Sequence, residues 1–177
     1  LIEDAAESLG SYVNDQHTGT FGVMGVLSFN GNKVITTGGG GMLITDDLNL
    51  ARHAKHITTT AKVSHTYEFL HDEIGYNYRM PNLNAALGCA QMERLDDFLT
   101  IKDKLSVQWA KFFDDKVIKF SRAIEGSKAN HWLNAVVLSS KSDRDRFLEY
   151  TNNSHVMTRP IWKLMSELKM FQDCQND

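Results

Sequence analysis

Two short apolar runs shape the first part of the chain, and turn residues bound each of them. Residues 22–29 (GVMGVLSF) and 41–45 (GMLIT) have the length and composition of short buried strands. The chain also opens on residues 1–4 (LIED), which have the pattern of a strand end. The pattern therefore predicts a sheet in the N-terminal part.

A helical pattern follows these strands. Asp46 and Asp47 stand where a helix N-cap is expected, and residues 48–57 have helical character. Residues 58–73 are polar, open on three consecutive threonines, and predict a loop or excursion from the fold.

The strongest helical pattern in the chain opens at Pro81. Its apolar residues recur at spacings of three and four with one gap, at Arg94: they are Leu83, Leu87, Ala90, Phe98, Ile101, Leu105, Trp109 and Phe112. A helix of about 30 residues would span roughly 45 Å. This length predicts one continuous helix that connects two domains.

The remaining pattern predicts a second α/β unit. Residues 132–139 (WLNAVVLS) and 155–159 are typical of strands, and residues 143–150 lie between them with a helical pattern. We therefore expect an α/β protein with three parts: a mostly parallel sheet domain (1–80), a long connecting helix (81–115) and the start of a small C-terminal domain (116–177).

Composition narrows the class of protein. With 177 residues, 42% hydrophobic and 23% charged, the chain can form a core, and the net charge of −3 gives no reason to expect nucleic acid or an anionic membrane as a partner. Two distant cysteines, Cys89 and Cys174, favour a reduced, cytoplasmic location. No apolar run reaches the roughly 18 residues of a membrane span. Because the chain opens within a strand and lacks an initiating Met, we expect a fragment of a longer protein.

A lysine among small polar residues is the main chemical candidate. Lys33 follows the apolar run 22–29, and four consecutive glycines occupy positions 38–41. Glycines allow unusual backbone dihedrals and a close approach to a ligand. A glycine-rich hairpin with an exposed lysine at its tip would have the same spacing. A phosphate-binding P-loop is excluded, because no GK[ST] follows the glycines.

Three segments in a fixed order make the pattern specific. Residues 3–8 (EDAAES), Ser28-Phe29 followed by Lys33 and the glycine run, and residues 75–80 (GYNYRM) occur together. The combination resembles the DegT/StrS family of sugar aminotransferases, which have the fold-type-I architecture and use pyridoxal 5′-phosphate (PLP). The resemblance is strongest over residues 1–113. It implies that residues 1–80 belong to the PLP-binding large domain.

The resemblance implies a role for each matching residue. Lys33 resembles the lysine that binds PLP as a Schiff base and moves protons, and Asp4 resembles the partner of the pyridine nitrogen. Ser28 resembles a phosphate-binding serine. Asn77 resembles the asparagine that reaches the PLP phosphate of a neighbouring subunit, which implies a homodimer with shared active sites. Considered singly, Asp4 would be a helix N-cap, Ser28 a strand-end serine and Asn77 part of a packed turn.

Two positions depart from the family pattern, and four others are weaker substrate candidates. Relatives carry Gln or His where this chain has Glu7, which would face either the cofactor or solvent, and Glu where it has Gly39. The substrate candidates are Arg79, in the segment 75–80, and three residues that stand where relatives contact the sugar nucleotide: His131, Arg159 and Trp162. Tryptophans such as Trp132 and Trp162 are also common in protein cores.

The resemblance implies transfer of an amino group, usually from glutamate, to a nucleotide-linked 4-keto-6-deoxy sugar for surface polysaccharide or nonulosonate synthesis. Residues 159–165 resemble the branch that acts on UDP-linked N-acetylated sugars. The alternatives are a same-fold PLP sugar dehydratase, in which histidine replaces the lysine, and a non-catalytic dimerisation or sensor relative. We expect the 177 residues alone to be inactive.

One pair of histidines raises the question of a metal. His53 and His56 are three residues apart on a predicted helix, as in some metal sites. No third ligand is evident in the sequence, so we interpret them as solvated helix residues and predict no metal.

Overall fold

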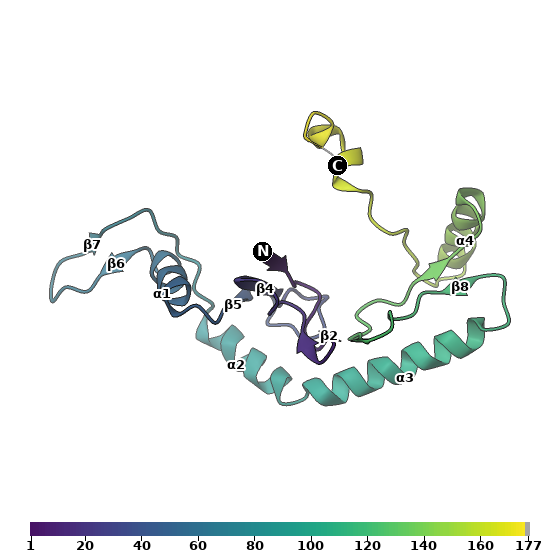
Figure 1. Ribbon diagram of the computed structural model, residues 1–177, viewed down its shortest axis with the longest axis horizontal. Coiled ribbons are helices and arrows are strands. Elements are labelled where there is room, and N and C mark those ends of the chain that lie inside the picture. The colour runs from purple at the N-terminus through teal and green to yellow at the C-terminus, as the bar shows by residue number, and fades with distance from the viewer. Residues whose placement is uncertain (176–177) are drawn as a thin grey trace.

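The computed structural model describes residues 1–175. Its centre is a three-stranded sheet with the order β1-β4-β5 (Figure 1). Strand β1 (Ile2–Asp4) pairs in parallel with β4 (Met24–Ser28), and β4 pairs antiparallel with β5 (Gly41–Ile44). All three strands lie where the apolar runs predict them.

A small core lies beneath this sheet and the loop that joins β4 to β5. Its buried members are Ala5, Leu27, Phe29 and Ile35. Partly buried side chains from later in the chain pack against them, namely Leu9, Ile44, Met80, Leu95 and Phe98. The loop that carries Lys33 is therefore anchored on a core shared with the helices.

Helix α1 (Leu48–Ile57) follows β5 and begins as predicted. The Asp47 side chain accepts hydrogen bonds from the backbone N–H groups of Asn49 and Leu50, which caps the helix. The predicted excursion after α1 contains a two-stranded hairpin, β6 (Lys62–Val63) with β7 (Leu70–His71). Figure 1 shows this hairpin extending away from the central sheet.

The predicted continuous helix after Pro81 is wrong in one respect. The structure has two helices, α2 (Asn82–Met92) and α3 (Leu95–Phe113), which change direction between them (Figure 1). At the break Arg94 has φ −108° and ψ 4°, outside the helical region, and its Nε donates to Asp97 at 2.9 Å. Asp96 and Asp97 then lie in the first turn of α3, where negative charge is favourable. The break coincides with the gap in the apolar spacing.

Helix α2 holds the Lys33 loop through side-chain hydrogen bonds. Asn84 Nδ2 donates to the Thr37 carbonyl at 2.5 Å, and Gln91 Oε1 accepts from the Thr36 N–H at 2.8 Å. Thr37 is only 2% exposed, so its polar groups depend on such partners. Gly88 faces the same loop, because a Cβ there would lie 2.9 Å from Thr37 Cγ2.

The C-terminal part differs most from its predicted strands. Of the predicted strand 132–139, only β10 (Val136–Val137) forms, antiparallel to β8 (Lys119–Phe120). The predicted helix is present as α4 (Lys141–Asn153). The predicted strand 155–159 is absent, because His155 has φ +60° and Thr158 is bonded back to the end of α4, 2.5 Å from Thr151 Oγ1. Two short 3-10 helices, η1 (Met165–Glu167) and η2 (Lys169–Phe171), end the described chain.

A second small sheet links the N-terminal part of the chain to the segment that follows β8. Strand β2 (Tyr12–Val13) pairs antiparallel with both β3 (Gln16–His17) and β9 (Ser127–Lys128). This pairing brings the segment that follows β9 back to the turn that follows β1.

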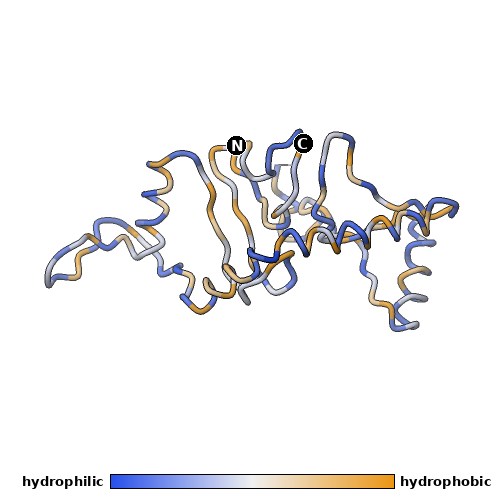
Figure 2. Tube along the Cα trace, turned by 90° about the horizontal axis from the view of Figure 1, so that it is seen from below, coloured by the Kyte–Doolittle hydropathy of each residue, from blue (hydrophilic) through white to orange (hydrophobic). Residues whose placement is uncertain are grey.

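The molecule is extended, with helices α2 and α3 along one side and α4 far from the β6–β7 hairpin (Figure 1). Hydrophobic positions recur along the outer elements as well as in the central sheet (Figure 2). On α3, only Ser106 and Ala110 are buried, while Ile101 is 63% exposed and Phe112 56%. Within residues 1–175 no helix combines the length and the apolar character needed to cross a membrane.

Candidate active site

The carboxyl ends of two parallel strands place Asp4 and Ser28 on one edge of the sheet. Asp4 ends β1, where it pairs in register with Val26, and Ser28 ends β4 two residues further on. Ligands of open α/β sheets bind at this kind of edge. The chain thus brings a carboxylate and a hydroxyl to the position typical of a binding site.

Both side chains already make local hydrogen bonds. Asp4 Oδ1 accepts from the Ala6 N–H at 3.1 Å, and Ser28 Oγ accepts from the Asn30 N–H at 3.3 Å. The residues after Asp4 form turns rather than a helix, with the Ser8 N–H donating to the Ala5 carbonyl at 2.9 Å. A helix N-cap is therefore not the role of Asp4, and Glu7 does not lie on a helical turn beyond it. Asp4 remains exposed and available to a ligand.

Lys33 lies in the loop after β4, and its amine is paired. Its Nζ is 2.5 Å from Glu7 Oε1, and its side chain is 13% exposed, against 50% for Glu7. Of the two orientations considered for Glu7, the carboxylate faces Lys33 rather than solvent alone. The exposed lysine of a simple hairpin tip is therefore not what the structure shows.

An aromatic ring covers the other side of the lysine amine. Lys33 Nζ lies 4.6 Å from the centroid of the Trp132 ring, in cation–π geometry. Trp132 is itself fixed, because its Nε1 donates to the Asn32 carbonyl at 2.6 Å. The Trp162 ring lies parallel to it, at 6.2 Å between centroids and 5° between planes. The structure therefore assembles Glu7, Lys33, Trp132 and Trp162 into one group.

A buried asparagine that the sequence analysis did not identify holds this group together. Asn130 is 5% exposed, and its Nδ2 donates to the carbonyls of Glu7 at 2.6 Å and Leu9 at 2.9 Å. Its Oδ1 accepts from the Trp132 N–H at 2.9 Å. Since the partners are more than 120 residues apart in sequence, no local pattern could have identified them.

The remaining predicted residues lie around or away from this group. His131 is next to Trp132, but its Nε2 faces Asp103 of α3 at 3.3 Å. Arg159 is exposed, and its guanidinium contacts the Met157 sulfur at 3.7 Å. Among the four substrate candidates, Trp162 alone contacts the lysine group, through Trp132.

Asn77 and Arg79 occupy a separate segment between β7 and α2. Asn77 forms an isolated bridge with Thr59, and both it and Arg79 are exposed. Within residues 1–175, no hydrogen bond or ion pair joins Asn77 to Asp4, Ser28 or Lys33. The stacked rings of Tyr76 and Tyr78, 5.1 Å apart, flank it.

The glycine run closes the loop that carries Lys33. Gly38 and Gly40 have φ of +81° and +89°, a conformation that other residues rarely adopt. Gly39 differs, because a Cβ there would meet nothing within 4 Å. The space at position 39 is therefore compatible with the larger side chain expected in relatives.

A second carboxylate of strand β1, that of Glu3, has a structural function. Glu3 Oε1 accepts from the Gly22 N–H at 2.6 Å, and Oε2 accepts from the Gly19 N–H at 2.7 Å. The Gly22 hydrogen bond is the largest cause that holds the pKa of Glu3 below its usual value, and the Gly19 bond adds to it. Through these two hydrogen bonds, Glu3 therefore holds the loop that precedes β4 in place.

Comparison with known families gives a match over the whole chain. Residues 1–177 match the family described as DegT/DnrJ/EryC1/StrS aminotransferase. The chain is 32% identical over 173 residues to GDP-perosamine synthase of Escherichia coli O157:H7, covering 98% of this chain and 47% of that protein. It is 33% identical over 172 residues to the putative pyridoxal phosphate-dependent aminotransferase EpsN of Bacillus subtilis, covering 97% and 44%. The chain thus spans about half the length of the curated relatives it matches.

Solved structures share the fold. Helicobacter pylori PseC, described as an aminotransferase of pseudoaminic acid biosynthesis, superposes with a TM-score of 0.90 at 21% identity, over 97% of this chain and 47% of that one. The E. coli GDP-4-keto-6-deoxy-D-mannose-3-dehydratase with bound hydrated PLP superposes with a TM-score of 0.80 at 24% identity, over 89% and 45%. The predicted α/β aminotransferase fold is confirmed. At these identities the superpositions do not separate amino transfer from dehydration.

Proposed function

The chain belongs to the DegT/DnrJ/EryC1/StrS aminotransferase family, and we propose that the full-length protein transfers an amino group from glutamate to a nucleotide-linked 4-keto-6-deoxy sugar, using PLP. The observation that carries this proposal is the environment of Lys33. Its amine is shielded by Trp132 and paired with Glu7, in the loop that follows the strand-end Ser28.

The residues present fit PLP. They supply an amine that can bond to an aldehyde, a carboxylate that can accept a hydrogen bond from a pyridine N–H, and a hydroxyl that can donate to a phosphate, on Lys33, Asp4 and Ser28 respectively. Asp4 and Ser28 share one edge of the sheet, and Lys33 follows in the next loop. The pair with the half-exposed Glu7 is non-covalent, so the amine can exchange this partner for the cofactor.

When bound, PLP supplies an electron sink for the carbon that loses or gains a proton. Lys33 would hold the cofactor through Nζ, and the same amine could move the proton as general base and acid. The Asp4 carboxylate would accept a charge-assisted hydrogen bond from the pyridine N–H. Ser28 Oγ would donate to a phosphate oxygen.

The substrate and the partners are further parts of the proposal. The exposed Trp162, stacked on Trp132, offers an aromatic face beside Lys33 for a sugar or base ring. Asn77 is exposed on a separate segment, which is compatible with its proposed contact to the cofactor phosphate of a second subunit in a homodimer. Surface polysaccharide or nonulosonate synthesis in the cytoplasm would use such a product.

The direct test is an amination assay on the full-length protein. Purified protein would be incubated with PLP, ¹⁵N-glutamate and UDP- or GDP-linked 4-keto-6-deoxy sugars. The products would be identified by mass spectrometry. We expect a ¹⁵N-labelled amino sugar, and none with Lys33→Ala. If glutamate yields no label while another amino donor does, the donor part of the proposal is wrong.

Dehydration is the second candidate, because a dehydratase shares the fold. The resemblance places histidine instead of lysine at the reacting position of such enzymes, and this chain has Lys33. The same assay separates the two reactions, since a dehydratase would release a sugar that has lost a hydroxyl and gained no nitrogen. A non-catalytic relative would give neither product.

A further inference from the structure

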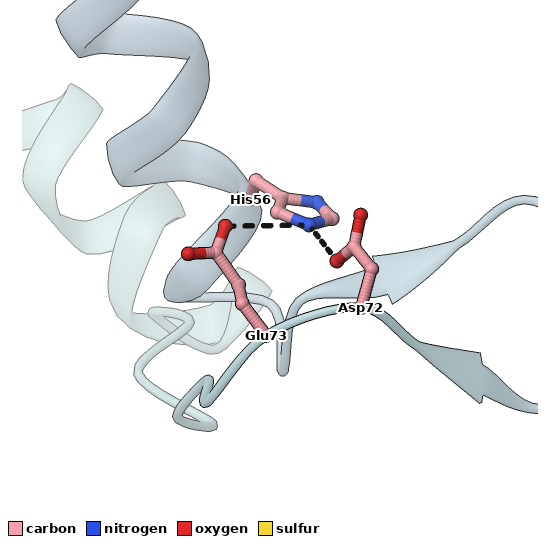
Figure 3. A group of neighbouring side chains, drawn as sticks. All are labelled: His56, Asp72 and Glu73. Atoms are coloured by element: carbon pink, nitrogen blue, oxygen red, sulfur yellow. Dashed lines mark hydrogen bonds and ion pairs between the residues drawn. The ribbon is translucent and has the colours of Figure 1, made fainter.

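A group of imidazole and carboxylate side chains lies at the C-terminal end of α1 (Figure 3). His56 Nε2 is 2.6 Å from Asp72 Oδ1 and 3.7 Å from Glu73 Oε1. The three atoms that could bind a metal all lie within 4.8 Å of one another. They come from two elements, since His56 is on α1 and the carboxylates directly follow β7.

A second histidine supports the same group. His53 lies one turn earlier on α1, and its Nε2 is 3.1 and 3.0 Å from the two oxygens of Glu73. Glu73 is therefore contacted by two imidazoles, while Asp72 is contacted by one. The two histidines, three residues apart on α1, therefore both have carboxylate neighbours that were not evident in the sequence.

Backbone contacts hold the two elements in this arrangement. The Ala61 N–H donates to the His56 carbonyl at 2.9 Å, and the Asp72 N–H donates to the Ala61 carbonyl at 3.3 Å. After the carboxylates, the Tyr76 N–H donates to the Ile57 carbonyl at 2.6 Å. The chain on both sides of Asp72 and Glu73 is therefore fixed to the end of α1, so the convergence does not depend on side-chain rotamers alone.

We propose that His56, Asp72 and Glu73 bind a divalent transition-metal ion of the zinc class, with His53 positioning Glu73. The two carboxylates carry a charge of −2, which a divalent cation balances. A single N–H at His56 Nε2 cannot serve both carboxylates, whereas a metal accepts a lone pair from each ligand atom. Imidazole nitrogen with carboxylate oxygen suits zinc, while magnesium and calcium prefer oxygen ligands alone.

The consequence is structural and stands apart from amino transfer. A bound ion would add a further link between α1 and the base of the β6–β7 hairpin. The ligands are partly exposed, at 29% for His56 and 57% for Asp72, so an ion could enter from solvent and retain water as its remaining ligands.

The test is zinc titration of the full-length protein, purified without a histidine tag and freed of unbound PLP. Calorimetry or competition with a chromophoric indicator would count the equivalents bound. We expect one equivalent that is lost in His56→Ala and weakened in Glu73→Gln. Substitution of His53 should weaken it by about 10- to 100-fold, the usual cost of losing a residue that orients a ligand.

Matched variants in the same hairpin serve as controls. His65→Ala and Glu68→Gln remove one histidine and one carboxylate that lie outside the group, and we expect both to keep the full equivalent of zinc. Circular dichroism would establish that each variant is folded, and the nearly isosteric Glu73→Gln keeps the test decisive if His56→Ala is not. Zinc binding that is the same in wild type, His56→Ala and Glu73→Gln, or no binding by wild type, would overturn the proposal.

Discussion

The amine of Lys33 and the carboxylate of Glu7 lie 2.5 Å apart, although 26 residues separate them in sequence. Glu7 is in the turn after β1, and Lys33 is in the loop after β4, so the pair joins the same two strands that place Asp4 and Ser28. Glu7 stands where relatives carry Gln or His, and this contact shows what the glutamate does in this chain. In this chain the residue beside the lysine is a carboxylate that pairs with its amine.

Substitution of Asp4 should separate binding from chemistry. Asp4→Asn keeps the shape of the side chain and loses its charge, so we expect PLP to remain bound while amino transfer slows by orders of magnitude. Single-turnover rates with glutamate, measured on the full-length wild type and variant, provide the comparison. Near-equal rates would leave Asp4 only its hydrogen bond to the Ala6 N–H.

Removal of Asn130 should destabilise the fold near Lys33. Asn130→Ala leaves the carbonyls of Glu7 and Leu9 without their donor in a buried place, a loss of about 1–3 kcal/mol. Urea denaturation of the full-length protein measures it. Asn134→Ala, at an exposed position, is the matched control and should change the free energy of unfolding by less than about 0.5 kcal/mol. Equal effects would show that the Asn130 bonds contribute nothing specific.

The clamp made by Glu3 should depend on pH. Because its pKa is lowered in the folded protein, its contribution to stability is fully present above the pKa of the unfolded chain and is lost as pH falls through the folded pKa. We therefore expect Glu3→Gln to be less stable than wild type at pH 7, and the difference to shrink as pH falls below about 4. A difference that stays constant in thermal melts from pH 7 to pH 3 contradicts this role.

Asn77 should act across a subunit boundary. Mixing a Lys33→Ala subunit with an Asn77→Ala subunit gives mixed dimers in which one site is intact and the other carries both losses. We expect activity to return on mixing, up to the share of intact sites. If mixed dimers form, as native mass spectrometry can establish, and activity stays absent, Asn77 serves the site of its own subunit.

Local patterns were sufficient for the central strands and for α1 and α4. Each of these elements is specified by residues within its own length, such as the Asp47 cap and the apolar run that became β4. The break at Arg94 was visible as a gap in spacing, but the ion pair that Arg94 forms there with Asp97 was not predicted. The strand predicted over residues 155–159 failed because side chains of α4 compete for its polar groups.

The residues of the site also include some that the sequence predicted and some that it did not. Lys33, Asp4 and Ser28 were singled out by the resemblance of their segments to a family pattern, and their catalytic roles stay predictions. Asn130, and the approach of Asp72 and Glu73 to His56, depend on contacts between distant segments. Such contacts leave no periodic pattern, so only the folded structure identifies them.

Chemical trapping of the cofactor lysine tests the central claim most directly. The full-length protein would be incubated with PLP, reduced with borohydride, digested and mapped by mass spectrometry. The account predicts a pyridoxyl group on Lys33, together with visible or near-ultraviolet absorbance before reduction that Lys33→Ala abolishes. A pyridoxyl group on any other lysine, with Lys33 unmodified, would contradict it.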